Sequence, residues 1–213
     1  MVDQKMRFVL PLFAASMCLT GTQLVAQAST GATGASQQPS MQNQQPATNP
    51  TSPMDAGMAN AQSLDDQDFL RKALQGGDAE VQLGQLAQQK SQSDDVKQFA
   101  QKMVQDHTAL GNKVMKPVAQ QLGVKEPKGI SKKDKELVAT LSQLSAAQFD
   151  QEYIKAMVKD HKQDLKDFKS EAEMSQNSSV KRVAEIGEKL ISQHLQLIEQ
   201  IAQKHNVEAL NQH

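Results

Sequence analysis

Apolar residues recur at intervals of three and four from residue 65 onwards, which is the period of an amphipathic α-helix. This pattern predicts an all-α fold, and no stretch shows the alternation of a strand. The expected elements are four long helices, over residues 65–90, 94–122, 146–174 and 179–205, and a short connecting helix over residues 131–144. One long connection between the second and third long helices favours a ferritin-like four-helix bundle, with an up-down-up-down bundle as the alternative.

Capping and helix-breaking residues define the expected helix ends. Ser93 and Ser145 stand where side-chain oxygens can accept from the free amides of a first helical turn. Gly123 should end the second long helix, and Pro117 should bend its last turns because it lacks a backbone N–H group.

The beginning of the chain has the features of a secretory signal peptide. Lys5 and Arg7 precede an apolar run over residues 8–19, and small residues follow up to Ala28. We therefore expect residues 1–28 to be removed and the protein to be periplasmic or secreted. The run is shorter than the roughly 20 residues that cross a bilayer, so we expect no transmembrane segment after cleavage.

Composition predicts three further segments. Residues 29–61 are rich in Gln, Ser, Pro and Thr with few large apolar side chains, which is typical of a disordered linker. The bundle should occupy residues 62–207, and residues 208–213 should form a C-terminal tail.

Charge and aromatic content exclude several classes of function. The chain has 23 basic and 24 acidic residues, a balance that argues against a nucleic-acid partner. One tyrosine and no tryptophan leave no aromatic platform for bases or sugars. No phosphate loop or activated nucleophile is recognisable. These absences favour a non-catalytic protein over an enzyme but do not decide the question. If the protein has a partner, we expect a second copy of the chain or a protein of the cell envelope.

Several short stretches resemble the domain-of-unknown-function 4142 family of exported bacterial proteins. They are Phe69-Leu70, Gly76-Gly77, Ala79-Glu80-Val81, Met103-Val104, Asp106-His107, Phe149-Asp150 with Tyr153, Asp160-His161 and His194-Leu195. The resemblance covers residues 65 to about 200, and it implies a ferritin-like fold and export but no activity. Lys189-Leu190 stands where the family usually has Leu-Pro, so we expect a straighter last helix.

One polar residue lies at the centre of the predicted buried face of each long helix. These residues are Glu80, His107, His161 and His194, and their mid-helix positions bring them to one level in either topology. A buried carboxylate and buried imidazoles require partners, which a shared metal ion would supply. The alternative is a polar core satisfied by hydrogen bonds and water, in a structural or interaction protein of the cell envelope that serves stress tolerance.

Imidazole ligands suit copper, zinc or iron, whereas the Glu-x-x-His pairs of di-iron bundles are missing from these helices. Asp106 and Asp160 each precede a histidine, and we expect them to orient the imidazoles by accepting hydrogen bonds. Met103 and Met157 lie one turn before those histidines. They are either core residues or thioether neighbours that would favour copper.

Overall fold

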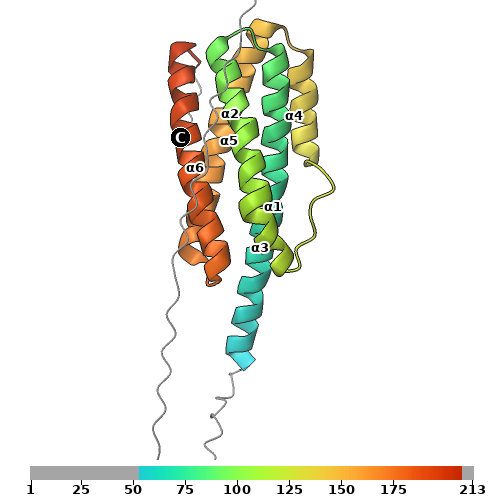
Figure 1. Ribbon diagram of the computed structural model, residues 1–213, viewed down its shortest axis with the longest axis vertical. Helices are drawn as coiled ribbons and strands as arrows, with labels where there is room; N and C mark the ends of the chain where they lie inside the picture. The colour runs from blue at the N-terminus through green and yellow to red at the C-terminus, as the bar shows by residue number, and fades with distance from the viewer. Residues whose placement is uncertain (1–52, 208–213) are drawn as a thin grey trace, which may run out of the picture. The chain divides into compact units, whose positions relative to one another are not determined.

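The computed structural model describes residues 53–207, which form an all-α bundle with no strand among them (Figure 1). Its elements are α1 (Pro53–Lys90), α2 (Asp94–Leu110), the π-helix η1 (Gly111–Met115), α3 (Lys116–Gln121), α4 (Lys132–Gln143), α5 (Ala146–Met174) and α6 (Ser178–Lys204). The predicted all-α class is confirmed. The predicted signal peptide, the first part of the linker and the C-terminal tail lie outside the described residues.

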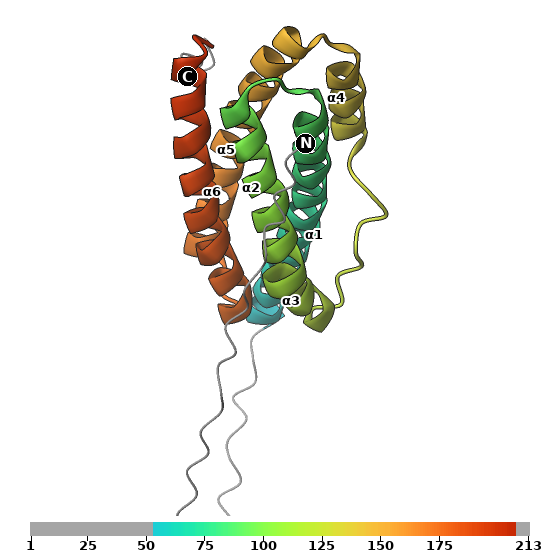
Figure 2. The same cartoon turned by 45° about the horizontal axis from the view of Figure 1, so that its top comes forward.

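The connection between α2 and α5 has the form expected of a ferritin-like bundle. Ser93 Oγ, at the start of α2, donates to Asp150 Oδ2, near the start of α5, at 2.9 Å. The two helices therefore begin at the same end and run parallel. The segment between them, which includes α4, returns along the bundle, as both views show (Figures 1 and 2). An up-down-up-down bundle would make the second and third long helices antiparallel.

The first helix is longer than the sequence pattern predicted. It begins at Pro53, so residues 53–61, which we expected in the disordered linker, are helical. Met58 and Leu64 are 70 % and 58 % exposed, and in Figure 1 the first turns of α1 extend past the other helices. Apolar periodicity marks only the part of a helix that packs against neighbours, and this extension carries no such stripe. Proline favours a helical start because its φ angle suits the first turn.

The second predicted helix is interrupted near Pro117, as expected, but by a π turn rather than a simple bend. Pro117 has no N–H group to donate to the carbonyl of Lys113, and the five residues of η1 precede it closely. In this turn the N–H of Lys116 donates to the carbonyl of Gly111. The helical path then ends at Gly123, whose φ of +70° is the left-handed conformation that glycine adopts readily.

The two predicted serine caps use their side chains in different ways. Ser93 stands at the N-cap of α2, but its side chain makes no hydrogen bond to the first turn and bonds to Asp150 instead. Ser145 precedes α5, and its Oγ donates to Gln148 Oε1 at 2.8 Å, which holds the start of that helix.

The hydrophobic core consists of two clusters that are separated along the bundle. One includes Leu83, Val96, Phe99, Met103, Phe149, Tyr153, Met157 and Ile198. The other includes Leu70, Leu74, Leu110, Met115, Phe168, Val180 and Ile191. On each long helix, the central polar residue falls between members of the first cluster and members of the second. The bundle thus contains one polar layer between two apolar ones. None of the helices within residues 53–207 meets the length and apolarity needed to cross a membrane.

Candidate metal centre

The polar layer contains all four residues that the sequence placed at the centre of a buried helical face. Glu80 comes from α1, His107 from α2, His161 from α5 and His194 from α6. Glu80 and His107 are 2 % and 5 % exposed, and the other two histidines are completely buried. Four helices therefore bring one glutamate and three imidazoles together in an interior where each needs a polar partner.

Each imidazole has one ring nitrogen, its outer nitrogen, beside an oxygen atom that does not belong to another histidine. The pairs are His107 Nδ1 with Glu80 Oε2 at 2.8 Å, His161 Nδ1 with the Met157 carbonyl at 2.9 Å, and His194 Nε2 with Asp106 Oδ2 at 2.8 Å. A carbonyl or a carboxylate accepts and an imidazole N–H donates. This arrangement assigns the ring proton of neutral His161 and His194 to the outer nitrogen. His107 carries its proton there when Glu80 is ionised, the state that a nearby cation favours.

The three histidines also bring ring nitrogens close to one another. One nitrogen from each histidine lies within 4.8 Å of the corresponding nitrogen of the other two. His107 Nε2 is 3.2 Å from His194 Nδ1, and the buried His161 Nε2 has no hydrogen-bond partner. With the protons on the outer nitrogens, each histidine has one ring nitrogen whose lone pair is free to bind an ion.

These separations fit a shared transition-metal ion. Zinc binds imidazole nitrogen at about 2.0–2.1 Å, so two nitrogens on one tetrahedral ion lie about 3.3 Å apart. The 3.2 Å between His107 and His194 agrees with that value, although a hydrogen bond has the same length. A shared ion would also satisfy His161 Nε2, which a hydrogen bond between the other two histidines leaves without a partner.

Glu80 lies beside two of the three histidines, His107 and His161. Its Oε2 is engaged by His107 Nδ1, on the side of the ring away from Nε2. Its Oε1 is 3.5 Å from His161 Nε2 and forms no hydrogen bond. Glu80 is positioned to orient His107 and to balance the charge of a bound ion through Oε2, while its predicted role as a ligand, through Oε1, stays a prediction.

Burial shifts the pKa values of the site in opposite directions. It lowers the pKa of each of the three histidines to about 4, because a protein interior disfavours the imidazolium charge. It raises the pKa of Glu80 to about 8, although the charge of His161 opposes that rise. For Asp106, burial acts upwards but hydrogen bonds from Lys102 and His194 hold the pKa below its usual value. The histidines are thus neutral at pH 7, which is the state that binds metals.

The predicted neighbours of the histidines take different positions. Asp106 bonds to His194 of another helix, not to the adjacent His107, and it also accepts from Lys102 Nζ at 2.6 Å. None of the hydrogen bonds among the described residues joins Asp160 to a histidine. One of its carboxylate oxygens instead lies within 4.8 Å of oxygens of Glu80 and Asp164.

Met103 and Met157 are fully buried in the hydrophobic cluster on one side of the polar layer. Met157 reaches the site through its backbone carbonyl, which accepts from His161. A backbone acceptor has no sequence signature, so this partner could not be predicted. Asp164 could have been, because it follows Asp160 by one turn on the same face of α5.

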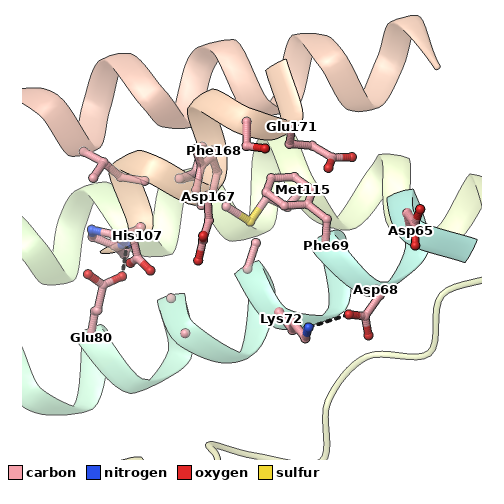
Figure 3. A pocket seen from close by; sticks show the side chains of 17 residues that line it. Asp65, Asp68, Phe69, Lys72, Glu80, His107, Met115, Asp167, Phe168 and Glu171 are labelled. Atoms are coloured by element: carbon pink, nitrogen blue, oxygen red, sulfur yellow. Dashed lines mark ion pairs between the residues drawn. The ribbon is translucent and has the colours of Figure 1, made fainter. Parts of the chain in front are cut away.

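A cavity of about 360 Å³ connects the polar layer with the surface. Glu80 and His107 lie at one end, Phe69, Met115 and Phe168 line the middle, and acidic residues lie towards the other end (Figure 3). Its acidic lining residues are Asp65, Asp68, Asp164, Asp167 and Glu171, in addition to Glu80. Lys72, the single basic lining residue, pairs with Asp68. A small cation could approach Glu80 by this route.

Comparison with known proteins gave one match. A family model described as a domain of unknown function (DUF4142) matches residues 49–201, a range that includes the four residues of the polar layer. No curated protein and no solved structure matched the chain.

Proposed function

The chain belongs to the DUF4142 family, whose function is unknown, and we propose that it is an exported protein that binds one transition-metal ion through His107, His161 and His194. In this proposal Glu80 and Asp106 orient two of the ligands and offset the charge of the ion. The protein binds the metal without catalysing a reaction.

The convergence of three ring nitrogens, each backed by an oxygen acceptor, carries this proposal. Metal-binding histidines commonly donate their other N–H to a carboxylate or a carbonyl, which sets the tautomer and the ring orientation. Here all three histidines have such an acceptor, from Glu80, Asp106 and the Met157 carbonyl. An ion would satisfy all three inner nitrogens at once.

Without an ion, the contacts from Glu80 through His107 to His194 require an additional proton. A hydrogen bond between His107 and His194 needs hydrogen on one of the facing nitrogens. If His107 donates there and remains neutral, its Nδ1 becomes an acceptor and Glu80 must be protonated. This metal-free state leaves His161 Nε2 unpaired, and it is the basis of the second candidate, a structural protein of the envelope with a polar core.

The donor set favours zinc, copper(II) or iron over cuprous copper. Imidazole nitrogen suits all of the first three, whereas cuprous copper prefers sulfur. The methionines near the site present a carbonyl and core-packing side chains rather than a thioether ligand.

Elemental analysis by mass spectrometry tests the proposal. The protein is purified without an affinity tag, beside His194→Ala and the matched control His205→Ala. His205 lies at the end of the same helix and pairs with Asp95, outside the trio. We expect about one equivalent of metal in the wild type and in the control, and none in His194→Ala.

Metal-free wild type that also fails to bind added zinc, copper or iron would refute the metal site and leave the structural candidate. An equal loss in the His205 variant would show that the binding is unspecific. Circular dichroism confirms that the variants keep their helices. Export is tested separately by fractionation and by sequencing the N-terminus, which we expect at residue 29.

A further inference from the structure

Three carboxylates form a second cluster beside the histidines. One oxygen each from Glu80, Asp160 and Asp164 lies within 4.8 Å of one oxygen of the other two. Glu80 is buried on α1, and the two aspartates are half-buried on α5. Within the described part of the chain, Asp160 and Asp164 take part in no ion pair. Carboxylates this close repel one another unless a cation or protons lie between them.

In the metal-free protein protons reduce this repulsion, because burial raises the pKa of Glu80 to about 8 and that of Asp164 to about 9. An unpartnered oxygen and a route to solvent would let a cation reach the cluster and displace those protons. Glu80 Oε1 is buried and has no hydrogen-bond partner, while its other oxygen is engaged by His107. Glu80 and Asp164 both line the cavity, whose acidic side chains outnumber its single lysine. Such a lining raises the local concentration of cations at the base of the cavity.

We propose that Glu80, Asp160 and Asp164 form a second cation site, for a hard divalent ion such as Mn²⁺ or Ca²⁺. Oxygen ligands bind Ca²⁺ at about 2.3–2.6 Å, so two oxygens on one such ion are at most about 5 Å apart. The observed limit of 4.8 Å meets that condition. Carboxylates and water suit Ca²⁺ and Mn²⁺, and the cavity leaves room for water to complete the coordination.

This site goes beyond the proposed function and does not require an ion at the histidines. Glu80 belongs to both groups of residues: its Oε2 contacts His107, and its Oε1, 3.5 Å from His161 Nε2, makes no hydrogen bond. The aspartates belong only to the second site, and His194 belongs only to the first. Variants of these residues therefore separate the two proposals.

Electron paramagnetic resonance with Mn²⁺ tests the second site. Chelator-treated protein is titrated with Mn²⁺, and the loss of the signal of the free ion gives the bound fraction. The variants are Asp160→Asn and Asp164→Asn, with Asp167→Asn as the matched control. Asp167 also lines the cavity from α5 and carries the same charge, but it lies outside the trio.

We expect the wild type to bind about one Mn²⁺, displaceable by Ca²⁺, and each trio variant to bind at least about tenfold more weakly. Asp167→Asn and His194→Ala should retain the binding. A wild type that leaves the Mn²⁺ signal unchanged would overturn the second site, and so would an equal loss in Asp167→Asn. Zinc binding that survives in Asp164→Asn while Mn²⁺ binding fails in all proteins would leave the histidine site standing alone.

Discussion

Replacing Glu80 with glutamine should stabilise the metal-free protein and weaken its affinity for metal. Burial raises the pKa of Glu80 from 4.5 to about 8, so at pH 7 the folded protein holds a proton that the unfolded chain has released. Because Glu80 is protonated in both states below pH 4.5, its raised pKa does not change the free energy of unfolding there. Between pH 4.5 and pH 8 the unfolded chain loses this proton while the folded protein keeps it, so the free energy of unfolding falls as the pH rises. At about 1.4 kcal/mol per pH unit, the opposition amounts to roughly 3 kcal/mol at pH 7 and roughly 4 kcal/mol at pH 8.

Glutamine has the shape of the protonated acid and no charge, so it removes this opposition. Its amide can also donate to His107 Nδ1, as the protonated carboxyl would. That donation places the ring hydrogen of His107 on the nitrogen that should bind the ion. We therefore expect zinc affinity to fall by about 10–100-fold, the usual effect of removing a carboxylate behind a metal-binding histidine.

Urea unfolding of chelator-treated wild type and Glu80→Gln at pH 5, 6, 7 and 8 measures the change in stability. Competition with a chelator measures the change in zinc affinity. In the wild type, zinc affinity should rise about tenfold per pH unit from pH 6 to 8, because binding displaces the proton on Glu80, and this slope should vanish in the variant. A stability gain that is the same at every pH, or a loss of stability at pH 8, would refute the reasoning.

Three further substitutions test packing and ligand orientation. A Cβ atom at Gly187 would overlap the ring of Phe168, so Gly187→Ala should lower the free energy of unfolding by about 1–3 kcal/mol, whereas Gly76→Ala, with open space around it, should raise it by up to about 1 kcal/mol. Thermal melts compare the pair, and shifts in the same direction would contradict the close contact. Asp106→Asn should weaken zinc binding by about 10–100-fold because the amide supports the His194 ring less well than the carboxylate. Unchanged affinity in the chelator assay would exclude that role for Asp106.

Most helix boundaries could be predicted because they depend on neighbouring residues. The helix over residues 146–174 matches the expectation at both ends, since Ser145 precedes it and the polar segment after Met174 ends it. The start of α1 was wrong by several turns because its first part makes no apolar stripe. The irregular turn before Pro117 was expected from the missing N–H group, but its π form depends on packing.

Periodicity by itself determined that Glu80, His107, His161 and His194 lie on buried faces at one level, because a helix repeats every 3.6 residues. Only the tertiary structure decided which atom faces which. The pairing of Asp106 with His194, the carbonyl behind His161 and the grouping of Asp160 with Asp164 all depend on neighbouring helices, ring orientation or backbone atoms. One helix's sequence encodes which of its faces is buried, but the partners of a buried polar atom come from other segments.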